Sequence, residues 1–239
     1  MKTNTLFQKW TAIVVVVICS AFSHEATYDC KAYLPEKEGT VLTYETLNHK
    51  EKLMSTHSLT VISIKEEGDT VFFNVGMKQN DKKGNETVDL EMEMKCADNK
   101  FFFDMESMIP AQAKEMLSQQ QVQMEIDSDF LTLPSKLSEG MELDDGAMTM
   151  SLKMGGNVIA SMSVEQYNRH VEAKETISVP AGTFQCWKIS SDIRTKVFGK
   201  EASTSSSDWY KVGTGLIKSE SYDKKGNLET LQQLTKLTK

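Results

Sequence analysis

The feature that most constrains the fold is a regular succession of strand-like runs separated by turn residues, which continues along nearly the whole chain after residue 38. Each run is about 6–12 residues long and tends to alternate apolar with polar side chains. The breaks between runs are rich in Gly, Asn, Asp and Lys, which are typical of tight turns. This pattern predicts antiparallel strands joined by hairpins, in a sheet that curls toward a barrel or sandwich.

The first half of the chain predicts strands at residues 40–47, 53–64, 71–78, 87–95 and 101–103. The turn sequence DKKGN occurs at residues 81–85 and again at 223–227. Gly84 and Gly226 are placed to adopt the left-handed conformation that closes a hairpin with a bulge. Since the flanking residues do not repeat, we interpret the two copies as similar turn chemistry and not as a duplication.

The second half predicts further strands at residues 122–126, 131–134, 148–154, 158–164, 171–179 and 184–189. Between the last two lies VPAGTF, where Pro180 fixes its own φ and lacks an N–H group. Pro180 and Gly182 fit a type I turn. Because no nucleophile with a neighbouring base occurs there, we interpret this corner as part of the fold.

One helix is predicted over residues 110–120, where Pro110 precedes a run of good helix formers. Its apolar side chains recur at helical spacing and form one face. We therefore predict an all-β protein with one helix. The expected architecture is a curved antiparallel half-barrel or open barrel of about ten to twelve strands, with the helix at its mouth.

The first 23 residues have the pattern of a signal peptide. A short basic region with Lys2 and Lys9 precedes an apolar run at residues 12–21, which is too short to span a bilayer. Ala21 and Ser23 are small residues at the −3 and −1 positions of a cleavage site before His24. Residues 24–239 are thus expected to form a single β-rich domain, exported to the periplasm or cell envelope.

Charge and cysteine content narrow the function classes. The chain has a formal net charge of −7 and no basic run, which argues against nucleic-acid binding. Cys30, Cys96 and Cys186 remain after cleavage, and an oxidising compartment favours a disulfide. We predict the pair Cys30–Cys96, with Cys186 buried as a small hydrophobic residue, although other pairings are compatible with the sequence.

Methionine is unusually frequent, with 14 residues in the chain. Met148, Met150 and Met162 are expected to meet across one hairpin, and Met108 and Met116 fall on the predicted helix. Flexible, polarisable thioethers suit acyl chains or varied apolar ligands, so these five are the candidate ligand-binding residues. The alternative is that they only fill the core. No cofactor and no metal site are expected.

The sequence offers little evidence for an arrangement of catalytic residues. Asp144 and Asp145 are sequence neighbours, whereas paired catalytic carboxylates must face one another across a cleft. The serine-rich stretch at residues 203–207 lacks a G-x-S-x-G motif or a nearby histidine. The sequence therefore predicts a protein that is not an enzyme.

Several motifs carry a resemblance to a known group. They are Asn168-Arg169, the Glu-Thr-Ile before Pro180-Ala181-Gly182-Thr183-Phe184, Trp209-Tyr210, and the strand from Gly213 to Tyr222. From about Pro35 to Leu237, the chain resembles the exported Bacteroidetes β-proteins of unknown function termed TapB-like. That resemblance implies a LolA/LolB-like architecture, in which a curved sheet capped by helical elements holds lipoprotein acyl chains.

These observations give three expectations for function. The first is a non-enzymatic envelope protein that binds an apolar or lipid-like ligand between the sheet and the helix at 110–120. The second is a structural or interaction module of the envelope with a filled core and a protein partner. The third, which has the least support, is a hydrolase acting on envelope glycans or lipids.

Overall fold

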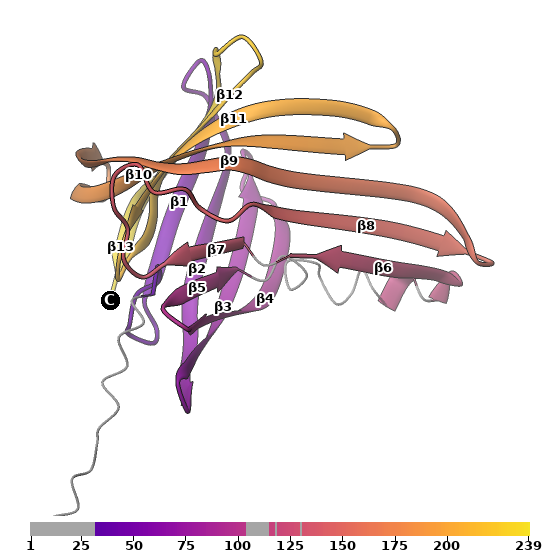
Figure 1. Ribbon diagram of the computed structural model, residues 1–239, viewed down its shortest axis with the longest axis horizontal. Helices are drawn as coiled ribbons and strands as arrows, with labels where there is room; N and C mark the ends of the chain where they lie inside the picture. Colours follow the sequence, from indigo (N-terminus) through magenta and orange to yellow (C-terminus); the bar gives the residue numbers. More distant parts are fainter. Residues whose placement is uncertain (1–31, 104–114, 118, 130) are drawn as a thin grey trace, which may run out of the picture.

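Thirteen strands form a single antiparallel sheet in the computed structural model, which describes residues 32–103, 115–117, 119–129 and 131–239 (Figure 1). The strands are β1 (Val41–Asn48), β2 (Leu53–Glu67), β3 (Thr70–Asp81), β4 (Glu86–Ala97), β5 (Lys100–Phe103), β6 (Val122–Ser128), β7 (Leu131–Pro134), β8 (Gly146–Met154), β9 (Asn157–Val179), β10 (Gly182–Val197), β11 (Lys200–Lys211), β12 (Gly215–Tyr222) and β13 (Leu228–Thr238). The all-β prediction is confirmed.

The strand order is β6-β8-β9-β10-β11-β12-β13-β1-β2-β3-β4-β5-β7, so the sheet is not closed into a barrel. The expectation of ten to twelve strands is too low, since thirteen strands pair in the sheet, including the short strands β5 and β7 that were predicted at 101–103 and 131–134. The two edge strands, β6 and β7, are consecutive in the chain. Two residues alone separate them, so the sheet must curl until its edges meet end to end.

Strand β9 differs most from the prediction. The sequence predicts separate strands at 158–164 and 171–179, whereas one strand of 23 residues runs from Asn157 to Val179. Asn168 has a φ of 52°, and its pairing with β10 shifts register between Ser190 and Asp192. A local bulge therefore lies where the sequence pattern predicts a break between two strands.

The repeated DKKGN turns have the predicted form. Gly84 has a φ of 87° and Gly226 a φ of 79°. In the first copy, the Asp81 carboxylate accepts backbone N–H bonds from Lys83 at 2.8 Å and Asn85 at 2.9 Å. Asp223 makes the equivalent bonds in the second copy. The conformation follows from local side-chain chemistry, so it could be predicted without tertiary information.

The Pro180 corner also serves the fold. It forms the two-residue connection between β9 and β10, and the Ala181 N–H donates to the Leu234 carbonyl at 3.2 Å. The tip of this hairpin is therefore attached to β13, which is not one of its sheet neighbours.

The core has two parts. In the larger, apolar side chains of β3, β4, β5 and β7 pack with those of β9 and β10, so that distant strands of the curled sheet contact one another. The smaller is formed by Leu42, Tyr44, Cys186, Trp209, Ile217 and Leu234.

A short segment before β1 enters the larger core. Residues 32–34 are almost completely buried, and the Tyr33 hydroxyl donates to the Pro134 carbonyl at 2.7 Å. The Tyr33 ring packs edge-on against Phe101 and Tyr210, with centroids 6.2 and 5.9 Å away. Residues from the N-terminal part of the domain thus fill space between the two halves of the sheet.

The predicted helix is described in part, since residues 115–117 and 119 are helical. The predicted signal peptide at 1–23 lies outside the described residues. In the part of the chain that the structure describes, no helix is long and apolar enough to cross a membrane.

Cys186 is a free, buried thiol as predicted, and burial raises its pKa to about 11. Cys96 is also fully buried, at the end of β4. Cys30 lies outside the described residues, so the Cys30–Cys96 pairing stays a prediction.

Gly215→Ala tests how tightly the N-terminal segment is packed. A Cβ at Gly215 would lie 2.7 Å from the Tyr33 carbonyl oxygen, in a backbone with a φ of +111°. Gly213 has a φ of +71° but open space around its Cβ position, so Gly213→Ala carries the conformational cost alone. In urea unfolding we expect the free energy of unfolding to fall by about 1–2 kcal/mol for Gly213→Ala and by about 3 kcal/mol or more for Gly215→Ala. Equal losses would contradict close packing of Tyr33.

Candidate functional site

The site begins at the seam where the two edges of the sheet meet. The Asp129 N–H donates to the Ala147 carbonyl at 2.8 Å, which continues the pairing of β6 with β8. Two residues later, Leu131 pairs with Phe103 of β5. The chain therefore passes from one edge of the sheet to the other at this point.

Packing at the seam is close around Gly146. A Cβ on Gly146, the first residue of β8, would lie 2.9 Å from the Leu131 side chain. A larger residue at position 146 would therefore require the end of the Leu131 side chain to move.

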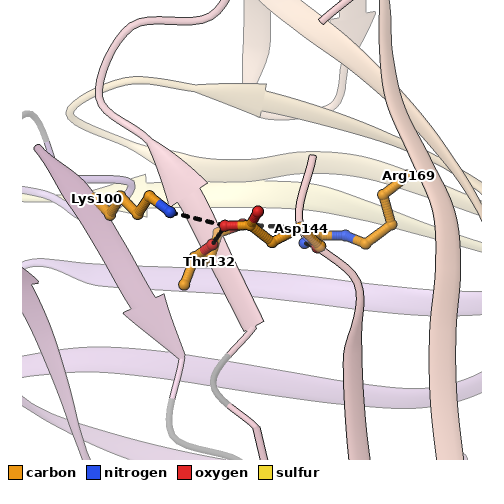
Figure 2. Close-up of polar contacts among 4 residues, drawn as sticks. All are labelled: Lys100, Thr132, Asp144 and Arg169. Carbon is orange, nitrogen blue, oxygen red and sulfur yellow. Dashed lines mark hydrogen bonds and ion pairs between the residues drawn. The ribbon is translucent and has the colours of Figure 1, made fainter. Parts of the chain in front are cut away.

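Arg169 of β9 holds this seam together. Its side chain is buried, with 2% exposure, and one terminal nitrogen donates to the Thr132 carbonyl at 3.1 Å. The other terminal nitrogen donates to the Asp144 carbonyl (Figure 2). Thr132 belongs to β7, and Asp144 to the segment before β8. One guanidinium therefore joins three parts of the chain that are far apart in the sequence.

The Asp144 carboxylate has different partners from its carbonyl. Figure 2 shows it beside the Lys100 ammonium, at 2.7 Å, and the Thr132 hydroxyl, at 3.4 Å. The hydrogen bond from Lys100 is the main reason that the pKa of Asp144 is lowered. The two charged side chains are 43% and 65% exposed, so solvent screens this ion pair.

A line of polar side chains crosses the sheet near Arg169. The Gln166 amide donates to the Ser191 hydroxyl at 2.7 Å, and Ser191 and Ser206 are 2.8 Å apart. The Ser206 hydroxyl in turn donates to the Asp208 carboxylate at 3.2 Å. Burial raises the pKa of Asp208, and the hydrogen bonds and the positive charge of Arg169 offset only part of this shift.

These polar groups stabilise the fold. The terminal nitrogens of Arg169 bind backbone carbonyls, and its Nε has no hydrogen-bond partner. Asp144 and Asp145, which the sequence analysis judged unsuited to catalysis, lie at the seam. Among the described residues, no group of three or more His, Cys, Asp or Glu side chains is placed to bind a metal ion.

An apolar cavity of about 140 Å³ lies against Tyr33 and Tyr210. It is lined by Tyr33, Leu34, Leu42, Tyr44, His57, Leu59, Met94, Phe103, Tyr210, Gly215, Leu216 and Gln232. These residues come from the N-terminal segment and from strands β1, β2, β4, β5, β11, β12 and β13. The curled sheet alone brings them together.

Two lining residues of the cavity form a rigid wall. The rings of Tyr44 and His57 are stacked, with centroids 4.7 Å apart and planes within 8°. The Tyr44 hydroxyl donates to the Leu216 carbonyl at 2.9 Å. Burial lowers the pKa of His57, so the neutral imidazole is favoured. This wall is therefore aromatic and uncharged at neutral pH.

Of the five predicted ligand-binding methionines, the four that the structure describes, Met116, Met148, Met150 and Met162, are not among the lining residues of this cavity. Met150 and Met162 are direct cross-strand partners on β8 and β9, and Met148 lies two residues along β8 on the same face. All three are half-buried. Met116 is 59% exposed, and Met108 lies outside the described residues. The cross-strand meeting is confirmed, whereas the ligand-binding role stays a prediction.

The aromatic residues of the cavity were not among the residues predicted to bind a ligand. The run Phe101-Phe102-Phe103 was a visible signal, since three consecutive aromatic residues in a short strand mark a contact surface. Tyr33 gave no signal, because it precedes the first predicted strand and its partner Pro134 is 101 residues away.

Comparisons with known proteins place the chain in a family. The sequence pattern described as DUF3108-like matches residues 37–234. No curated protein sequence matches the chain.

Solved structures show the same fold. A predicted exported protein with a YmcC-like fold from Bacteroides fragilis is 21% identical, with a TM-score of 0.71 over 88% of this chain and 100% of that chain. A predicted lipoprotein from Parabacteroides distasonis is 22% identical, with a TM-score of 0.71 over 87% of this chain and 99% of that one. Both agree with the resemblance to exported Bacteroidetes proteins, and they show the fold alone.

Arg169→Met should lower the free energy of unfolding by about 3 kcal/mol or more, because it leaves two carbonyls at the seam without a donor. Arg169→Lys should recover only part of this, since an ammonium lacks the planar fork that reaches both carbonyls. The matched control is Asp144→Asn, which removes the screened ion pair and should cost at most about 1 kcal/mol. Chemical denaturation measures the free energy of unfolding of all three variants. Similar losses for Arg169→Met and Asp144→Asn would contradict the role of Arg169 in joining the edge strands.

Asp208→Asn should stabilise the protein at neutral pH. Because the folded-state pKa of Asp208 is raised above its ordinary value of 3.8, the folded protein binds the proton more tightly than the unfolded chain. Wild-type stability attributable to this group is therefore greatest below pH 3.8 and declines as pH rises through the folded-state pKa. Thermal unfolding from pH 4 to 8 should show a growing advantage for Asp208→Asn, and a less stable variant at pH 7 would contradict the assignment.

Proposed function

The chain belongs to the DUF3108-like family, and from the geometry of its interior we propose that it is a non-enzymatic envelope protein that binds a small apolar group, such as the end of an acyl chain. The observation that carries this proposal is the cavity between Tyr44 and Phe103, whose lining is almost entirely aromatic and aliphatic. Apolar pockets with few polar groups are typical of lipid and small-molecule sites.

The size of the cavity limits the ligand. A volume of about 140 Å³ is close to that of an apolar protein cavity of about 150 Å³ that binds benzene. It is well below the roughly 300–1,000 Å³ of pockets that enclose whole drug-sized ligands. A long acyl chain could therefore place only its terminal carbons there. The polar ends of His57 and Gln232 lie at the same cavity and can face the more polar part of an amphipathic ligand.

Export supports the same proposal. The chain begins with the pattern of a signal peptide, and the matched structures are of a predicted exported protein and a predicted lipoprotein. A compartment bounded by membranes supplies fatty acids and lipids as ligands.

Uptake of an apolar dye tests the proposal. N-phenylnaphthylamine should gain fluorescence on binding to the exported chain, and decanoate should displace it. Met94→Trp places a large ring in the cavity and should weaken uptake at least about tenfold, while circular dichroism shows that the fold persists. Met150→Asp is the matched control, because it lies on β8 outside the cavity and should leave uptake unchanged.

The outcomes separate the two apolar sites. Loss of uptake in Met150→Asp but not in Met94→Trp would assign binding to the methionine face instead. A flat titration of the wild-type protein would overturn ligand binding altogether.

A second candidate function is an interaction module of the envelope with a filled core. The observation that favours it is the burial of residues 32–34 between the halves of the sheet, which leaves limited space inside. This function predicts a flat dye titration.

A further inference from the structure

The turn between β10 and β11, Phe198-Gly199, contains a residue type that is unusual for its backbone conformation. Three of the described hairpins have two-residue turns in which both residues have positive φ, as type I′ turns require. They are Asp98-Asn99 (50° and 58°), Gly155-Gly156 (57° and 82°) and Phe198-Gly199 (48° and 78°). Asn, Asp and Gly tolerate this conformation, whereas a bulky aromatic residue is strained in it. Phe198 is therefore the exception.

Packing does not offset the strain at Phe198. Its side chain is 75% exposed, more than any other large hydrophobic side chain in the described part of the chain. The Phe198 backbone N–H donates to the Ser161 carbonyl at 3.3 Å, which fixes the turn against β9 but leaves the ring in solvent. A strained and exposed aromatic residue is more consistent with a contact outside the chain than with folding.

Further apolar side chains lie at the same end of the sheet. The turn between β8 and β9 is flanked by Met154, Val158 and Ile159, which are 47%, 57% and 53% exposed. Figure 1 shows that the β8–β9 and β10–β11 hairpins extend in the same direction, away from the centre of the sheet. Ser161, which binds Phe198, is two residues from Ile159. We call Met154, Val158, Ile159 and Phe198 the apolar tip.

Two exposed lysines flank the aromatic residue of the apolar tip, although the whole chain has a net charge of −7. Lys196 and Lys200 flank Phe198 and are exposed, and neither forms an ion pair among the described residues. Glu201 is the cross-strand partner of Lys196, but its carboxylate lies 3.8 Å from the Arg194 guanidinium. Two unpaired ammonium groups thus lie beside an exposed phenyl ring.

We propose that the apolar tip inserts into an anionic lipid surface, with Phe198 in the interfacial region and the ammonium groups of Lys196 and Lys200 at the lipid phosphates. Aromatic rings favour the boundary between water and hydrocarbon, and long lysine side chains reach from there to charged headgroups. An acidic lipid surface provides both complements at once, whereas an acidic protein surface provides only the charge.

Vesicle flotation tests the proposal with the full exported chain. Wild-type protein should float with vesicles that contain phosphatidylglycerol and phosphatidylcholine, and much less with phosphatidylcholine alone. Phe198→Asn creates an Asn-Gly turn, which suits the backbone better, so its melting temperature should be equal or higher. The same variant should nevertheless lose at least fivefold in bound fraction.

Two further variants make the test specific. Phe198→Trp should retain binding, and its fluorescence should shift to shorter wavelength on addition of anionic vesicles. Met54→Asn removes another exposed apolar side chain, 46% exposed on β2, and should bind like the wild type. The results expected for Phe198→Trp and Met54→Asn do not depend on the cavity. Met94→Trp, which fills the cavity, should also float like the wild type. This test therefore remains valid if the proposed ligand binding fails.

Several results would overturn the proposal. These are no flotation of the wild-type protein, equal flotation of Phe198→Asn, or equal binding to neutral and anionic vesicles. A wild-type dimer that Phe198→Asn converts to a monomer, without vesicle binding, would identify a second copy as the occupant and would also overturn it.

Discussion

The buried guanidinium of Arg169 is the interaction on which the curled sheet depends most. An open sheet of thirteen strands has two free edges, and here the chain passes directly from one edge strand to the other. Arg169 joins β9 to the Thr132 carbonyl of β7 and to the Asp144 carbonyl. A buried charge is costly unless its hydrogen bonds are satisfied. The site is therefore stable only when the edges are correctly placed, which favours one curvature of the sheet over others.

This curvature decides how much space remains inside. Residues 32–34 fill part of the interior, and Tyr33 contacts rings from β5 and β11. What remains is a cavity bounded by Tyr44, Phe103 and Leu216. The interior thus contains a polar part that stabilises the fold and an apolar part that includes the cavity. The apolar tip, in contrast, lies on strand ends that project beyond this interior.

Local chemistry accounts for what could be predicted. The DKKGN turns, the Pro180 corner and the alternating strands follow from preferences of a few neighbouring residues, so the all-β class was predictable. The hairpin that brings Met150 near Met162 was also predictable from its Gly155-Gly156 turn, but their direct pairing was not, because it depends on a register shift between Leu152 and Lys153. The cavity was not, since its lining comes from seven strands and a segment before β1. The continuity of β9 was not predictable either, because the bulge at Asn168 interrupts the alternation of apolar and polar residues as a break between strands would.

The sequence by itself determined the class of fold and the hairpin turns, because each depends on residues close together in the chain. The tertiary structure alone decided the meeting of the edge strands, the role of Arg169 and the position of the apolar cavity. These depend on contacts between residues separated by tens of positions, such as Tyr33 and Pro134. Alternation tells which side chains share a face of a strand, but the curvature of the sheet decides which faces meet.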